Sequence, residues 1–225
     1  MHIGLIGGIG PAATEFYYRQ LTIATSRENR HLDLTIVHAD LRDLLDNLAS
    51  DSRTAQAEVF HGLTARLKAA GADVVAITSM AGHFCIQEFE KVSPLPVCSA
   101  IEAVRADLIP RGINAVGLLG TRAVMISQLF GGLKGFAVKI PDGDVLERTD
   151  REYIAMARAG CASEPQREFF FETAHRLHRA GADVVLLAGT DLFLAFDGRD
   201  CGVVTIDCAT VHIASLLRLT STKPD

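Results

Sequence analysis

Short apolar runs alternate with longer segments of helical periodicity along the whole chain. The runs that predict buried strands cover residues 2–6, 35–38, 74–77, 115–119, 184–188 and 203–206, with shorter ones near 97 and 138. Helical patterns begin at Pro11 and near residues 54, 123 and 166. Because strands alternate with helices, the pattern predicts α/β structure with parallel sheets and right-handed crossovers.

The pattern also repeats. The segment AGADVV occurs at 70–75 and again at 180–185, and GLIGG at 4–8 is echoed by GLLGT at 117–121. These matches, at offsets of 110 and 113 residues, indicate an internal duplication. We expect two pseudo-symmetric α/β domains, residues 1–100 with 209–225 and residues 101–208, with a ligand cleft between them.

Composition and charge narrow the possible functions. The chain has 225 residues, 48% of them apolar, and a net charge of −5 without a basic run, which argues against nucleic acid as a partner. Its apolar runs are too short to span a bilayer and no signal peptide is recognisable, so we expect a cytoplasmic protein. Five cysteines without CxxC spacing favour neither a disulfide framework nor a zinc site.

Candidate chemistry lies where strands end, because ligands of parallel sheets bind at the carboxyl ends of strands. The first such segment is Gly7-Gly8-Ile9-Gly10-Pro11, whose glycines could bring backbone N–H groups to an anion such as a carboxylate. It also fits a short dinucleotide fingerprint, with Asp40 as the ribose ligand, or a purely structural tight turn. The second and third segments are 77–80 and 188–191, which the repeat makes equivalent.

The opening GLIGGIGPAATEFYY, the paired ADVV strands, GLLGTRAVM and the closing IDCA with His212 resemble the aspartate/glutamate racemase superfamily over nearly the whole chain. The resemblance implies a substrate bound between two α/β domains, a cofactor-independent reaction, and two cysteines, one in each half, that exchange the α-proton as base and acid. A homodimer is common in such folds, so a homo-oligomer is expected.

This chain departs from the family pattern at both cysteines. Aligning the motifs puts the first at Ile77, or at Thr78 if the register slips by one, and the second at Gly189. A two-thiol α-proton exchange is therefore not expected, unless other groups such as Asp191 and His83 replace the thiols. The resemblance implies an isomerase of a small amino acid or dicarboxylate. The alternatives are a lyase or decarboxylase, or a catalytically silent carboxylate-binding protein.

Residues near the strand ends supply the candidates. We expect the catalytic groups to be Asp191, His83 and Thr78. The substrate-binding candidates are Gly8, Gly10, Arg53, Thr78, Ser79, Met80, Thr121, Arg122, Arg167, Gly189, Thr190 and His212. The arginines would bind carboxylates bidentately. Arg53 and Arg167 could instead pair with Asp51 and Glu164, and both histidines could be structural.

Overall fold

A computed structural model describes residues 1–8 and 10–221 of the chain. The chain divides into two compact units, Met1–Ala103 with His212–Asp225, and Val104–Val211. The α/β class predicted from the sequence is confirmed, because each unit contains a four-stranded parallel sheet flanked by helices. Within the described residues, no helix combines the length and the apolar character needed to cross a membrane.

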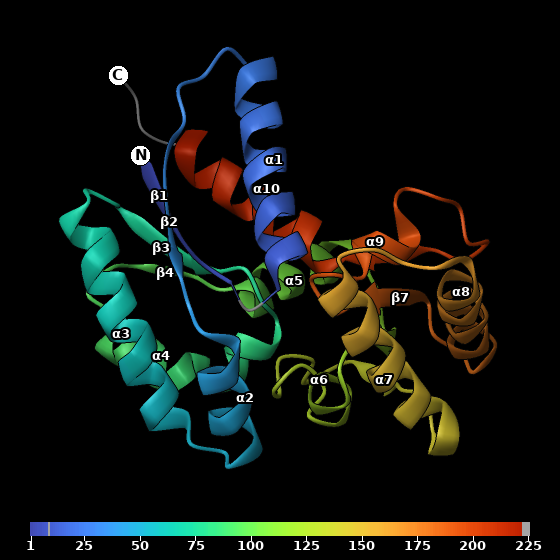
Figure 1. The fold of residues 1–225 in the computed structure, drawn as a ribbon. Coiled ribbons are helices and arrows are strands. Elements are labelled where there is room, and N and C mark those ends of the chain that lie inside the picture. Colours follow the sequence, from blue (N-terminus) through green and yellow to red (C-terminus); the bar gives the residue numbers. More distant parts are fainter. Residues whose placement is uncertain (9, 222–225) are drawn as a thin grey trace. The chain divides into compact units, whose positions relative to one another are not determined.

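Unit 1 contains a sheet with the strand order β2-β1-β3-β4. Its elements and the helices that follow them are β1 (His2–Gly7), α1 (Pro11–Arg27), β2 (Asp33–His38), α2 (Leu41–Ala49), α3 (Arg53–Ala69), β3 (Val74–Ile77), the 3-10 helix η1 (Ala81–Cys85), α4 (Ile86–Val92), β4 (Val97–Cys98), α5 (Ala100–Leu108) and, near the C-terminus, α10 (Cys208–Ser221). Helix α1 lies on one face of this sheet, and α3 with α4 lies on the other (Figure 1).

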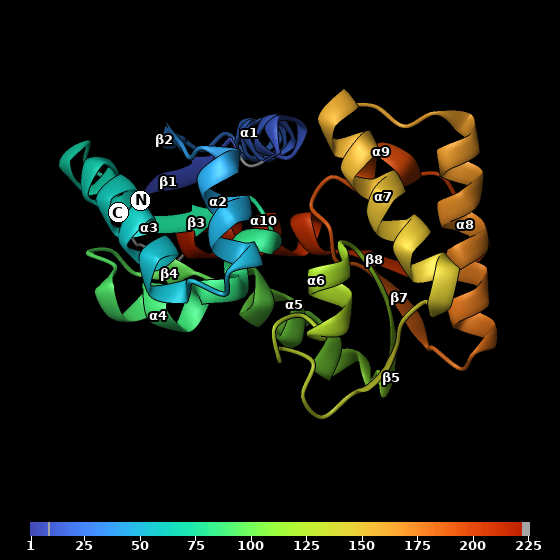
Figure 2. The same cartoon turned by 60° about the horizontal axis from the view of Figure 1, so that its bottom comes forward.

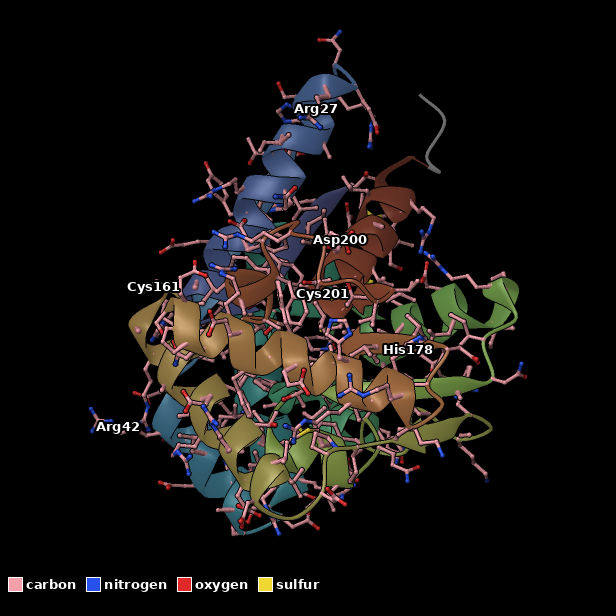
Figure 3. All side chains as sticks on the ribbon, turned by 90° about the vertical axis from the view of Figure 1, so that its right-hand side faces the viewer. Arg27, Arg42, Cys161, His178, Asp200 and Cys201 are labelled. Carbon is pink, nitrogen blue, oxygen red and sulfur yellow. The ribbon has the colours of Figure 1, made fainter. Side chains whose placement is uncertain are left out.

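Unit 2 repeats this topology with the strand order β6-β5-β7-β8. Its elements are the 3-10 helix η2 (Ile109–Arg111), β5 (Ala115–Leu119), α6 (Arg122–Ile126), β6 (Ala137–Lys139), α7 (Gly143–Ala159), α8 (Glu164–Arg179), β7 (Val184–Leu187), α9 (Phe193–Phe196) and β8 (Thr205–Asp207). Helix α8 packs on β5 and β7, and α7 lies beside α8 (Figure 2). The loop between them carries Cys161, the exposed cysteine (Figure 3).

The repeated AGADVV segment performs the same structural task in each unit. Gly71 and Gly181 both have φ +94°, the left-handed conformation in which a glycine ends a helix without steric cost. Two residues later, an aspartate fixes the neighbouring strand: Asp73 Oδ2 accepts from the His2 amide at 2.8 Å, and Asp183 Oδ2 accepts from the Ala115 amide at 2.8 Å. The segment therefore joins a helix end to the start of a strand pair.

Glycines in the central strands explain the second repeated segment. A Cβ at Gly4 would meet Leu67 of α3, and a Cβ at Gly117 would meet Leu177 of α8, both at 3.0 Å. Each glycine therefore lets a helix leucine pack directly against the backbone of its sheet. Leu67 and Leu177 are themselves 110 residues apart and buried, so the two units share their packing as well as their topology.

Candidate functional site

The strand ends of the two units correspond residue by residue. Strand β3 ends at Ile77 and β7 ends at Leu187, 110 positions later. The next amide is held in the same way in both units: Thr78 donates to a carbonyl of β1 at 3.0 Å, and Ala188 donates to a carbonyl of β5 at 2.6 Å. Counted along the sequence at the same offset, Ser79 corresponds to Gly189 and Ala81 corresponds to Asp191.

This correspondence changes one interpretation of the sequence. Gly189, the expected position of the second family cysteine, matches Ser79 in unit 1. Ile77, the expected first position, lies inside β3 with 0% exposure and matches Leu187. The structure therefore favours Ser79, and not Ile77, as the counterpart of Gly189. The sequence motifs alone placed the first cysteine at Ile77, or at Thr78, because they do not show where strands β3 and β7 end.

In unit 2, a tyrosine side chain fills the space above Gly189. A Cβ built at Gly189 would lie 2.7 Å from Cζ of Tyr153 and 3.0 Å from its phenol oxygen. The same phenol donates a hydrogen bond to Oδ2 of Asp191 at 3.1 Å. Tyr153 and Asp191 are 8% and 4% exposed, so a carboxylate and a phenol are paired in a largely dry environment.

Two more titratable groups follow strand β8. Burial raises the pKa of Asp207 to about 6, although this carboxylate accepts from the Thr210 amide at 2.9 Å at the start of α10. Burial also holds the pKa of Cys208 well above its usual range, and the carboxylates of Asp207 and Asp191 raise it further. Cys208 is therefore a thiol and not a thiolate at neutral pH, which suits a role in packing.

Hydroxyl groups gather at the corresponding strand ends of unit 1. Thr78 Oγ1 lies 3.0 Å from Thr14 Oγ1 and 3.2 Å from the carbonyl of Ile6. Thr14 also accepts from the Gly8 amide at 3.2 Å and lies 3.2 Å from the carbonyl of Gly10. The Gly8 N–H is thus directed at a side chain, although the sequence suggested that it could bind an anion. Ile9 lies outside the described residues.

His83 is held between backbone groups of unit 1. Its Nε2 accepts from the Ala100 amide at 3.0 Å, so Nδ1 carries the hydrogen that is donated to the carbonyl of Ser79 at 2.8 Å. Burial lowers the pKa of His83 to about 4. Both ring nitrogens are therefore engaged and burial favours the neutral ring, which agrees with the structural alternative. The catalytic role expected for His83 stays a prediction.

His212 is held in the same manner. Its Nε2 donates to the carbonyl of Cys98 at 2.8 Å, and its Nδ1 accepts from the hydroxyl of Tyr17 at 2.8 Å. Burial lowers the pKa of His212 to about 3, and the neighbouring His83 lowers it further. The ring centroids of His83 and His212 lie 6.1 Å apart. The two histidines thus form a neutral, structural polar cluster with Tyr17.

The candidate cations differ in their surroundings. Arg53 pairs with Asp51 at 2.8 Å on the surface, and Arg122 pairs with Glu147 at 2.9 Å, also on the surface. Arg167 is 8% exposed, donates from NH1 to the carbonyl of Ala195, and lies 3.4 Å from Glu164. Among the described residues, its Nε has no hydrogen-bond partner. The atom that lies 3.4 Å from Oε1 of Glu164 is this Nε, so the ion pair that the sequence offered as the alternative role of Arg167 is present.

Other candidates are buried or serve as helix caps. Met80, Thr190 and Ser79 are 1%, 2% and 7% exposed. The Thr121 hydroxyl accepts from the Val124 amide at 3.4 Å and caps α6. Asp40, the possible ribose ligand, accepts from the Arg42 amide at 2.7 Å and caps α2. A structural role thus accounts for the side chain on which the dinucleotide interpretation depended.

Tyr153 is the residue of this site that the sequence analysis missed. It lies on α7, for which no helix was predicted. The buried residues of α7 include Thr149, Tyr153 and Met156, which lie at helical spacing. This spacing was a signal in the sequence, but Thr149 interrupts the apolar face and charged residues surround it. The contact with Gly189, 36 positions away, is not encoded in any local pattern.

The structure thus defines a class of protein with two α/β units. Each unit has a four-stranded parallel sheet with the same strand order, and polar residues follow corresponding strands. The chain belongs to the Asp/Glu/Hydantoin racemase family, whose model matches residues 6–216. The prediction that the strand ends of the two units share one cleft stays a prediction.

Solved structures show how widely this fold is shared. A proposed Asp/Glu racemase from Yersinia pestis superposes with a TM-score of 0.85 at 23% identity, covering 99% of this chain and 100% of its own. An aspartate racemase homologue from Pyrococcus horikoshii OT3 gives 0.80 at 24% identity, covering 98% and 99%. An arylmalonate decarboxylase gives 0.58 at 16% identity, covering 100% and 95%. At these identities the likeness concerns the fold.

Proposed function

We propose that the protein is a cofactor-independent isomerase of the racemase type that acts at the carbon next to the carboxylate of a small amino acid or dicarboxylic acid. The observation that carries the proposal is the buried carboxylate of Asp191, at the carboxyl end of β7. Removing a weakly acidic α-proton requires a base that is positioned in advance. Membership in the racemase family supports the same reaction class.

The surrounding groups suit a carboxylate ligand. Arg167 would bind a carboxylate oxygen through its Nε in place of the ion pair that this atom forms with Glu164, since a guanidinium interacts strongly with a carboxylate. The hydroxyl of Thr190, in the loop after β7 of the same unit, would donate to a further carboxylate oxygen. In this proposal Asp191 carries the proton, and His83 and His212 support the fold of unit 1.

A decarboxylase is the second candidate, and one observation favours it. The position in unit 1 that corresponds to Asp191 is Ala81, so a carboxylate is present at one of the two equivalent strand ends. Decarboxylation replaces a carbon–carbon bond with one carbon–hydrogen bond and needs a proton delivered to a single face of the carbon. Racemisation needs proton transfer on both faces. The fold shared with an arylmalonate decarboxylase is compatible with this chemistry.

A panel of carboxylates separates these functions. The wild-type protein is heated with L-aspartate, L-glutamate, malonate or maleate, and we expect one of them to raise the unfolding temperature, since a ligand of the native state stabilises it. The same compounds and phenylmalonate are then incubated with the protein in D2O and followed by proton NMR. We expect loss of the α-proton signal of an amino acid.

Each outcome of the panel identifies one class. Loss of the α-proton signal without release of CO2 supports the isomerase. Release of CO2 from a malonate, without exchange of an amino acid, supports the decarboxylase and contradicts the isomerase. A thermal shift with neither reaction identifies a catalytically silent binding protein. Asp191→Asn is expected to remove either reaction, because the proposed proton carrier is lost.

A further inference from the structure

The glycine at 189 is required by the tyrosine above it. Gly189 does not have a positive φ, so its backbone conformation is open to any residue. What excludes a side chain is the Tyr153 ring, whose Cζ lies 2.7 Å from the position of a Cβ. The phenol oxygen of Tyr153, 3.0 Å from that position, therefore occupies the space that a short polar side chain at 189 would use.

Tyr153 and Asp191 together have the parts of a proton-transfer system. The phenol O–H points its hydrogen at Oδ2 of Asp191. The phenol oxygen also accepts a hydrogen bond from the backbone of Asp191, which leaves one of its two lone pairs to accept a proton from elsewhere. The carboxylate of Asp191 can thus receive the proton of the phenol while the phenol oxygen accepts another proton. The pair lies within unit 2, on α7 and in the loop after β7.

We propose that Tyr153 and Asp191 form a proton relay that replaces a side chain at 189, with Tyr153 as the catalytic residue that meets the substrate carbon. The proposal rests on the proposed function, because it specifies how the α-proton travels. It differs from direct attack by Asp191, in which Tyr153 would serve only to orient the carboxylate. It also gives this chain a route to proton transfer that uses neither of the family cysteines.

The relay balances without a co-reactant. The Cα–H bond of the substrate breaks, and its proton binds the phenol oxygen of Tyr153. At the same time the phenol O–H bond breaks and that proton binds Oδ2 of Asp191. The electron pair of the Cα–H bond stays on the substrate as an enediolate. Tyr153 begins and ends as a neutral phenol, Asp191 ends as a neutral acid, and the return of the proton reverses each step.

The environment of the phenol supports a relay over a free phenolate. Burial, followed by the charge of Asp191, holds the pKa of Tyr153 well above its usual range. A lone phenolate would therefore be rare at neutral pH. The nearby Cys208 thiol is neutral as well. In the relay, the carboxylate of Asp191 is the partner that receives the proton of the phenol.

The test compares four variants with the wild type for exchange of the α-proton of L-aspartate and L-glutamate in D2O. Tyr153→Phe keeps the ring and removes the hydroxyl, and we expect exchange to fall by at least about 100-fold, the usual effect of losing an acid–base group. Asp191→Glu, which keeps a carboxylate, should retain more exchange than Asp191→Asn. Tyr18→Phe, at an exposed tyrosine of α1, is the control and should exchange like wild type.

Thermal unfolding with and without malonate accompanies each variant, so that a folding defect is recognised. Loss of exchange in Tyr153→Phe with an intact melting transition and malonate shift supports the relay. Exchange within about threefold of wild type in Tyr153→Phe, together with its loss in Asp191→Asn, overturns the relay and leaves the proposed function standing. Absence of exchange in the wild type overturns both.

Discussion

Gly189→Ala is expected to destabilise the protein, although alanine is usually tolerated better than glycine in a regular backbone. The added Cβ would lie 2.7 Å from Cζ of Tyr153, and that ring is 8% exposed and hydrogen-bonded to Asp191. The ring or the strand-end loop must shift to make room. Forcing a methyl group into a packed site costs about 1–3 kcal/mol, which urea or thermal unfolding detects as a lower transition midpoint.

Two comparisons make this result specific. Gly62→Ala, within α3, places its Cβ where no atom lies within 4 Å, and we expect it to stabilise the protein by about 0.5–1 kcal/mol. In a Tyr153→Ala background, Gly189→Ala should cost much less than in the wild type. An equal cost in both backgrounds would contradict the proposed contact. The same contact means that a thiol introduced by Gly189→Cys requires the Tyr153 ring to move.

The duplicated fold was predictable because local sequence determines the repeated junctions. Gly71 and Gly181 end helices in the same left-handed conformation, and Asp73 and Asp183 accept hydrogen bonds from the strand beside them. Few other residue types could replace these residues. A positive φ favours glycine, and the short side chain of aspartate accepts hydrogen bonds from nearby backbone amides. A repeat of such residues predicts a repeat of the structure, which the two identical strand orders confirm.

The candidate site was less predictable, because its geometry depends on contacts between distant residues. Asp191 was identified from its place after a strand, but its partner Tyr153 comes from a helix 38 positions earlier. His83 was identified by its place in the sequence, yet its chemistry depends on the Ala100 amide, which occupies Nε2. Side-chain type and spacing located these groups at the strand ends. Which of them can move a proton depends on how the helices pack on the sheets, and this packing joins residues that are far apart in the sequence.

Unit 1 is expected to lose stability in mild acid because of its two buried histidines. An unfolded histidine titrates near pH 6.5, whereas burial lowers the pKa of His83 to about 4 and that of His212 to about 3. As the pH falls below 6.5, the unfolded chain binds these protons and the folded chain does not, so the equilibrium shifts toward unfolding. Stability is complete above the unfolded pKa and is lost progressively as the pH falls from 6.5 to about 4 for His83 and to about 3 for His212.

The expected loss at pH 5 is about 2 kcal/mol for each histidine, which is large compared with the stability of an ordinary domain. Urea unfolding at a series of pH values should show it as a falling free energy of unfolding. His83→Gln and His212→Gln should each remove about half of the slope, whatever they cost at neutral pH. His31→Gln is the control, because its side chain is 84% exposed and its pair with Asp33 lies in solvent. A slope unchanged in both buried-site variants would show that other groups bind the protons, and that burial does not keep the two rings neutral.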